Sequence, residues 1–132
     1  MKNLSILLLF LVLSSSCRTI SQSADQPKFE ETHWKLIAIS KQTVDLGDKA
    51  YIEFDDEKAS GKAGCNSFTA GIVKVNGHLS FEDIVSTKMY CEGVMDYENQ
   101  IITNMAKVKR FEIRYGLLYM YSADELVLTF KK

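Results

Sequence analysis

The side chains in this 132-residue chain that could most readily react or bind a metal belong to three cysteines and two histidines. They are Cys17, Cys65, Cys91, His33 and His78. A cysteine thiolate with a histidine base beside it is a nucleophile. Two thiolates and two imidazoles together supply the four ligands of a structural zinc site. Two cysteines in an oxidising compartment form a disulfide. The residues around the cysteines and histidines indicate which of these three roles applies: nucleophile, zinc site or disulfide.

The spacing around Cys65 and Cys91 favours a disulfide. Neither histidine lies in a recognisable nucleophile motif, and no CxxC or HxxxH spacing supports a zinc site. Three cysteines leave one over, but a modified Cys17 would remove that odd residue and leave the other two as a pair. Closing a loop of this length would contribute about 3 kcal/mol to stability. We therefore expect a disulfide, no catalytic residue, no metal and no cofactor. A nucleophilic Cys65 and a zinc site are the alternatives.

The N-terminal part of the chain differs in composition from the rest. A basic start precedes an apolar run from Leu4 to Leu13, and three serines then lead to Cys17. This order is typical of a secretory signal peptide, and the apolar run is too short to span a membrane as a permanent helix. Small residues directly before a cysteine resemble a bacterial lipobox, although Ser14 stands where a bulky aliphatic residue is usual. We expect a signal peptide over residues 1–16, then a lipidated cysteine and a flexible tether over residues 17–28.

Composition limits the partners of the remaining chain. Residues 29–132 have the length of one globular domain. Lysine and arginine number 16 against 17 for aspartate and glutamate, so no basic excess favours nucleic acid. The lipid would therefore be the membrane anchor, since the charge adds no hold on an anionic surface. We expect a monomer in the cell envelope, periplasmic or surface-facing. The outer membrane is favoured because Arg18 replaces the aspartate of the inner-membrane retention signal.

The dominant hydrophobic period in the predicted domain is two, which indicates β-strands. An early strand places Trp34, Leu36 and Ala38 on one face and Ile37 and Ile39 on the opposite face. Further along, Asn76-Gly77 separates two alternating runs. This dipeptide predicts a two-residue type I′ hairpin, because both central positions of that turn need a positive φ.

Residues 94–110 break the strand rhythm. Their apolar side chains recur at spacings of three and four, at Val94, Tyr97, Ile101, Met105 and Val108. This stripe predicts a helix that covers a curved sheet. Further strands follow, with turns at Gly116 and at Ala123-Asp124. The fold class is mainly β, with a minor α component. We expect a small antiparallel curled sheet or cracked β-barrel of about eight strands with one main helix.

Three short motifs resemble those of the META domain, the family of HslJ-like heat-shock lipoproteins. "GCNSFTAG" at 64–71 matches G-C-N-x-[FY]-x-G with its last glycine one residue late, and "TKMYC" at 87–91 matches T-x-M-x-C. An early glutamate in the following helix completes the pattern. The matching residues are Gly64, Cys65, Asn66, Phe68, Gly71, Thr87, Met89, Cys91 and Glu98. The resemblance covers essentially everything after the tether.

The resemblance implies a small antiparallel β structure, paired cysteines and no established catalytic activity. The leading hypothesis is a non-catalytic, lipid-anchored envelope protein that contributes to stress tolerance through an unidentified partner, either an envelope protein or an apolar ligand. The alternative is a binding protein for an apolar or acyl ligand, by analogy with secretion pilot lipoproteins of similar fold. A filled interior would favour the first hypothesis, and a cavity lined by leucine, isoleucine and phenylalanine the second.

The motif residues also have structural interpretations. Gly61 and Gly64 are expected where the backbone needs a positive φ or where strands approach closely. Asn66 is expected to cap or turn the chain through its side-chain amide, in preference to binding a ligand. Thr87 and Met89 are expected to pack around the disulfide.

Overall fold

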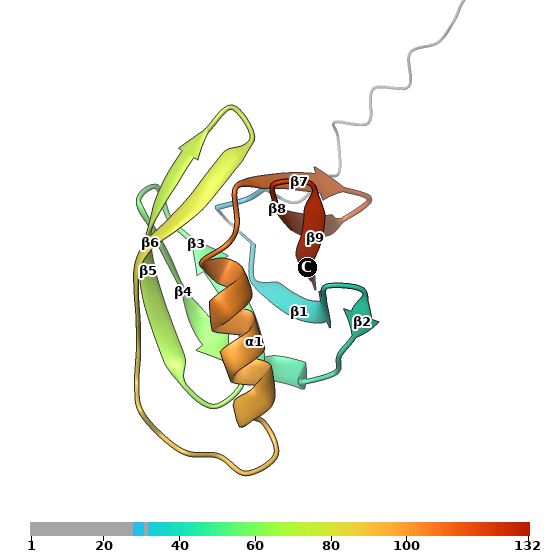
Figure 1. The fold of residues 1–132 in the computed structure, drawn as a ribbon. Coiled ribbons are helices and arrows are strands. Elements are labelled where there is room, and N and C mark those ends of the chain that lie inside the picture. The colour runs from blue at the N-terminus through green and yellow to red at the C-terminus, as the bar shows by residue number, and fades with distance from the viewer. Residues whose placement is uncertain (1–27, 31) are drawn as a thin grey trace, which may run out of the picture.

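The computed structural model describes residues 28–30 and 32–132, in which one antiparallel sheet curls into a ring around a helix (Figure 1). The expected signal peptide, Cys17 and almost all of the tether lie outside the described residues. The elements are β1 (Trp34–Ile39), β2 (Gln42–Thr43), the short 3-10 helix η1 (Gly47–Lys49), β3 (Ala50–Phe54), β4 (Lys58–Ala63), β5 (Ser67–Val75), β6 (His78–Ser86), α1 (Met95–Met105), β7 (Arg110–Arg114), β8 (Leu117–Ser122) and β9 (Glu125–Lys131).

The expected fold class is confirmed. Strands follow the order β2-β1-β3-β4-β5-β6-β7-β8-β9, and β9 also pairs with β1. The described chain has nine strands instead of about eight, because two residues after β1 form the short strand β2. The ring is uneven. Four residue pairs join β1 to β9, whereas a single pair, His78 with Arg110, joins β6 to β7. The sheet is therefore almost open between β6 and β7.

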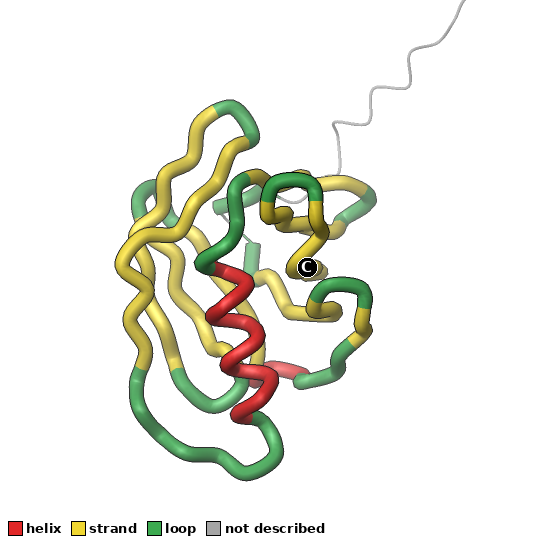
Figure 2. Tube along the Cα trace, in the orientation of Figure 1, coloured by secondary structure: helices red, strands yellow, loops and turns green. Residues whose placement is uncertain are grey.

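The predicted hairpin turn and helix are both present. Asn76 and Gly77 have φ of 50° and 80°, and they connect the paired residues Val75 and His78. The helix is shorter than the predicted range of residues 94–110: α1 covers Met95–Met105, and it runs across the concave side of the sheet (Figure 2). Val108 therefore lies outside the helix, and β7 begins at Arg110. In the described chain no helix has both the length and the apolar character needed to cross a membrane.

The buried face of β1 differs from strict alternation. Trp34 and Leu36 are buried as predicted, but Ile39 is buried and Ala38 is not. The register between β1 and β9 shifts between Leu36 and Ala38. Because a β-bulge inserts one extra residue, it exchanges the two faces of the strand beyond it. The prediction that Ala38 shares the face of Trp34 was therefore wrong.

The interior of the ring is filled with side chains. Trp34 is fully buried, and its indole N–H donates to the carbonyl oxygen of Phe29 at 3.0 Å. Ile101 and Met105 of α1 are buried as well. The gap they share with the sheet is lined also by Ile52 and Phe130, and it has no room for a water molecule. The described residues thus leave no cavity at this position that could take an acyl chain.

Gly61 allows β4 to approach β3 closely. A Cβ atom at this position would overlap the backbone carbonyl of Tyr51, which cannot rotate away. We expect Gly61→Ala to lower the free energy of unfolding by about 2 kcal/mol, because the two strands would have to separate locally. Urea unfolding monitored by tryptophan fluorescence measures this. Ser60→Ala is the matched control on the exposed face of β4 and should stay within about 0.5 kcal/mol of wild type. Equal stabilities of the two variants would contradict the expectation.

Candidate functional site

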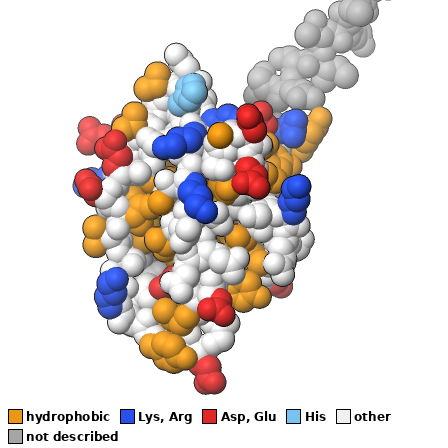
Figure 3. Space-filling view, viewed as in Figure 1, with side chains coloured by type: hydrophobic (Ala, Val, Ile, Leu, Met, Phe, Trp, Pro, Cys, Tyr) orange, Lys and Arg blue, Asp and Glu red, His pale blue; other side chains and the backbone are white. Residues whose placement is uncertain are grey.

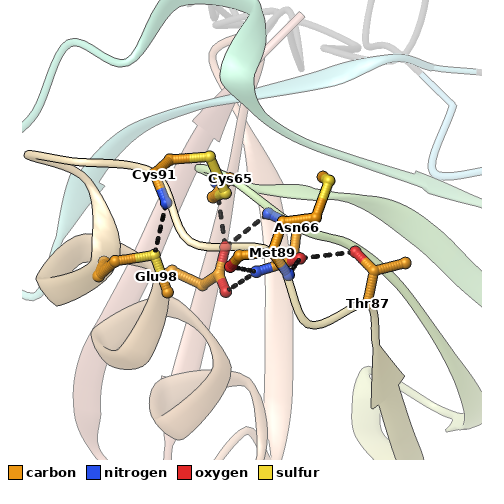
Figure 4. Close-up of a disulfide and its surroundings, with 7 residues drawn as sticks. Cys65, Asn66, Thr87, Met89, Cys91 and Glu98 are labelled. Carbon is orange, nitrogen blue, oxygen red and sulfur yellow. Dashed lines mark hydrogen bonds between the residues drawn. A yellow bond between two sulfur atoms is a disulfide. The ribbon is translucent and has the colours of Figure 1, made fainter.

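Cys65 and Cys91 form a disulfide between the turn after β4 and the segment before α1 (Figure 4). Their Cα atoms lie 5.7 Å apart, within the usual range for such a bond. The bond uses the sulfur atom that a nucleophilic Cys65 or a zinc site would need. Among the described residues, no cluster of three or more histidine, cysteine, aspartate and glutamate side chains could hold a metal ion.

Glu98 extends from the first turns of α1 toward the backbone beside the disulfide, and only 6% of the residue is exposed. Its Oε2 accepts hydrogen bonds from the backbone N–H groups of Cys65, at 3.0 Å, and Asn66, at 2.6 Å. Gly64, with φ of 119°, precedes these two N–H groups. Consecutive N–H groups and the beginning of a helix both favour a negative charge. The two N–H groups and the helix start therefore offset the cost of burying the Glu98 carboxylate, which forms no ion pair within the described part of the chain.

Asn66 connects three segments through its side-chain amide. Its Oδ1 accepts from the Thr87 hydroxyl and from the Met89 N–H, both at 2.7 Å. Its Nδ2 donates to the Met89 carbonyl oxygen at 2.9 Å and to Glu98 Oε1 at 2.6 Å. These four bonds use the whole donor and acceptor capacity of an asparagine amide. Asn66 therefore holds the turn after β4, the segment after β6 and α1 together (Figure 4).

Most of the motif residues meet in this one cluster. Phe68 and Gly71 lie outside the cluster. Phe68 is part of the hydrophobic core, and Gly71 lies further along β5, where it pairs with Glu82 of β6. Thr87 contributes a hydrogen bond where packing was expected. Met89 contributes its backbone, and 55% of the residue is exposed.

One contributor escaped the sequence analysis. Met95, at the start of α1, accepts a weak hydrogen bond at its sulfur from the Cys91 N–H, at 3.4 Å. The only sequence signal for it was its position four residues after a motif cysteine.

A groove of about 380 Å³ lies over the cluster, between the segment after β6 and the outer side of α1. Asn66 and Glu98 form part of its lining. The other lining residues are Ser86, Thr87, Lys88, Met89, Tyr90, Met95, Asn99, Ile102 and Thr103. None of them is a histidine or a free cysteine. The lining offers hydrogen bonds and apolar contacts.

The chain is thus a small antiparallel β protein in which a disulfide and a buried carboxylate lie beside a surface groove. The family model of the META domain matches residues 27–132. The chain therefore belongs to the META domain family. The META domain family is not a known enzyme family, and it is associated with the cell envelope.

Two structures solved by NMR share the fold. One is a protein from Burkholderia xenovorans, with a TM-score of 0.65 at 18% sequence identity, covering 85% of this chain and 94% of that one. The other has a TM-score of 0.63 at 21% identity, covering 78% of this chain and 90% of that one. At these identities the likeness establishes the fold alone. No curated protein matches the chain.

Proposed function

We propose that this chain is a lipid-anchored, non-catalytic protein of the bacterial cell envelope that contributes to stress tolerance by binding a partner protein. The observation that carries the proposal is the use of the motif residues for structure. Cys65 is bonded to Cys91, the Asn66 amide makes four hydrogen bonds, and the Glu98 carboxylate accepts three. No reactive group remains in this cluster, so its role is to hold a surface in place.

Two further observations support export and anchoring. A disulfide forms and persists in oxidising compartments such as the bacterial periplasm. The small residues before Cys17 resemble a lipobox, in which the cysteine becomes the acylated N-terminus. A single acyl chain holds a protein only marginally on a membrane, so stable anchoring needs more than one chain.

The filled interior favours the partner-binding role over the acyl-binding alternative. A site for an acyl chain needs an apolar cavity large enough to bury it. The space between α1 and the sheet excludes even a water molecule. The groove outside it has a mixed polar and apolar lining that suits a polypeptide better than a lipid tail.

We expect Cys17→Ser to move the protein from the membrane fraction to the soluble fraction, or to leave it as an uncleaved precursor. The full chain would be expressed in a bacterium that exports lipoproteins, and the N-terminal peptide of the wild type identified by mass spectrometry. That peptide should begin at Cys17 and carry acyl chains. Ser15→Ala keeps a small residue before the cysteine and should leave anchoring unchanged. A wild-type protein that begins elsewhere or carries no lipid would contradict the proposal.

A further inference from the structure

The described chain begins at one end of the ring, where it packs against β3, β5 and β7. The ring of Phe29 stacks on Phe54 of β3, with ring centres 3.9 Å apart, and lies 4.6 Å from the ring of Phe111 in β7. Lys74, near the end of β5, lies over the Phe29 ring at 4.6 Å and forms an ion pair with Glu30. The chain therefore joins the domain between β7 and the tip of the β5–β6 hairpin.

A continuous row of side chains crosses the outer face of the sheet at the same end. Val75 of β5 pairs with His78 of β6, and His78 pairs with Arg110 of β7. Arg110 in turn pairs with Tyr121 of β8. Directly paired residues of antiparallel strands share a face, and this face is the outer one because Val75 is 58% exposed and His78 is exposed. The row adjoins the contacts of Phe29, since its members are chain neighbours of the residues of β5 and β7 that hold that ring.

Arginine and tyrosine side chains continue this surface along β7 and β8. Arg110 lies over the ring of Tyr121, 3.7 Å from its centre, and Arg114 lies 5.8 and 5.5 Å from the ring centres of Tyr115 and Tyr119. We call these five residues the arginine–tyrosine face. Tyr115 is 72% exposed, and Arg114 forms no ion pair within the described residues. Figure 3 shows hydrophobic and basic side chains, with a few acidic ones, at the upper end of the molecule, where Figure 1 places β7 and the hairpin tip. Tyrosine and arginine are suited to the boundary between lipid and water, because each has an apolar body and a polar tip.

The length of the tether limits which end of the domain can lie near a membrane. Eleven residues separate Cys17 from Phe29, and fully extended they reach at most about 40 Å. The disulfide and the groove lie at the other end of β5 and β6, which are nine residues long, so they are roughly 26 Å from the hairpin tip. Bringing the groove to the bilayer would use most of that reach. An acylated Cys17 instead holds the arginine–tyrosine face at a high effective concentration near the lipid, where a weak contact is sufficient.

We propose that the arginine–tyrosine face lies on the surface of the phospholipid bilayer, with its guanidinium groups on lipid phosphates and its tyrosine rings among the headgroups. A guanidinium group binds phosphate oxygens in pairs, and the ring beneath it leaves its N–H edge available. The whole chain has a net charge of −1, so the acyl chains supply the hold and this face sets the orientation. The inference rests on the proposed anchoring at Cys17. It directs the groove away from the membrane, toward a partner in the aqueous compartment.

The test is paramagnetic relaxation NMR of the isotope-labelled, exported protein in lipid nanodiscs. The discs contain phosphatidylethanolamine and phosphatidylglycerol, with a trace of a lipid that carries gadolinium on its headgroup. Discs without gadolinium give the reference signals. We expect the strongest broadening at the amides of residues 75–78 and 114–116, and little at residues 88–90 beside the groove.

Two variants make the same change of charge at opposite ends of the domain. Arg114→Glu should lower the ratio of docked to undocked domain at least about fivefold, which is the contribution of one basic residue near an anionic lipid surface. The broadening at residues 75–78, in the neighbouring hairpin, measures this ratio. Lys88→Glu is the matched control and should change it less than about twofold, because salt screens a charge so far from the lipid. Both positions are exposed, so neither change should unfold the protein.

Uniform broadening of the surface amides, the strongest broadening at residues 88–90, or equal effects of the two variants would each overturn the proposal. Signals of the arginine–tyrosine face that change only with the number of protein molecules per disc would overturn it as well, and would assign the face to a second copy of the chain. A protein without acyl chains would not enter the discs, and this result would overturn the anchoring and the orientation together. An acylated protein with uniform broadening would overturn the orientation alone.

Discussion

Alanine in place of Glu98 should lower the free energy of unfolding by about 3 kcal/mol. The change removes the acceptor of three hydrogen bonds, those from the N–H groups of Cys65 and Asn66 and from the Asn66 amide. Leaving a buried donor unsatisfied costs about 1–3 kcal/mol each, and bonds to a charged acceptor are at the strong end. Water entering from the adjacent groove would offset part of this loss. Urea unfolding of the exported, disulfide-bonded protein measures the change.

Two companion variants separate the hydrogen bonds from the charge. Asp96→Ala removes an exposed carboxylate from the same helical turn, and we expect it to cost less than about 1 kcal/mol, since only the interaction with the helix dipole is lost. Glu98→Gln keeps the shape but replaces one acceptor oxygen with a donor NH₂ group, so its loss should fall between the other two. If Glu98→Ala were no more destabilising than Asp96→Ala, the buried carboxylate would not be a structural element.

Local chemistry made some features of the fold predictable from the sequence. Asn76-Gly77 specifies its turn because few other residue pairs tolerate two positive φ angles in succession. The helix was predictable because its apolar stripe has the helical period over several turns. Both signals are contained within short stretches of the chain. Neither depends on which distant segment packs against it.

The errors arise where distant segments decide the outcome. The bulge in β1 is needed for its register with β9, a strand almost a hundred residues later, and the residues around Ala38 carry no mark of it. The opening between β6 and β7 likewise depends on where β7 returns after α1. Alternation predicts which face of a strand is buried, but it does not predict where one extra residue reverses that face.

The motifs predicted which residues belong to the site, but they did not predict how these residues contact one another. The motifs named Asn66 and Glu98, which lie 32 residues apart in the sequence and hydrogen-bond to each other in the structure. Spacing alone does not identify which polar side chains become buried partners. Met89 shows the limit most clearly, because the structure uses its backbone and leaves its side chain exposed. Nothing in the structure explains why methionine in particular stands there.

Removing the disulfide through the paired change of Cys65→Ala and Cys91→Ala should lower the free energy of unfolding by about 3 kcal/mol. The bond joins residues 26 apart, and freeing a loop of this size restores that much entropy to the unfolded chain in the entropic account. For a domain of this size the midpoint of thermal unfolding, Tm, should fall by roughly 10–15 °C. Differential scanning calorimetry of the exported protein measures the shift. The paired change avoids a free thiol that could form mixed disulfides.

Reduction of the wild-type protein provides the matched control, since it breaks the same bond without changing packing, and its Tm should approach that of the paired variant. The loss should also be coupled to that of Glu98→Ala. The disulfide holds Cys65 where its N–H meets the Glu98 carboxylate, and Cys91 beside Met95 of the same helix. Neighbouring contributions of this kind are not additive. The combined variant should therefore lose less stability than the two losses added together. Full additivity would show that the bond and the carboxylate act separately, and an unchanged Tm in the paired variant would remove the stabilising role of the disulfide.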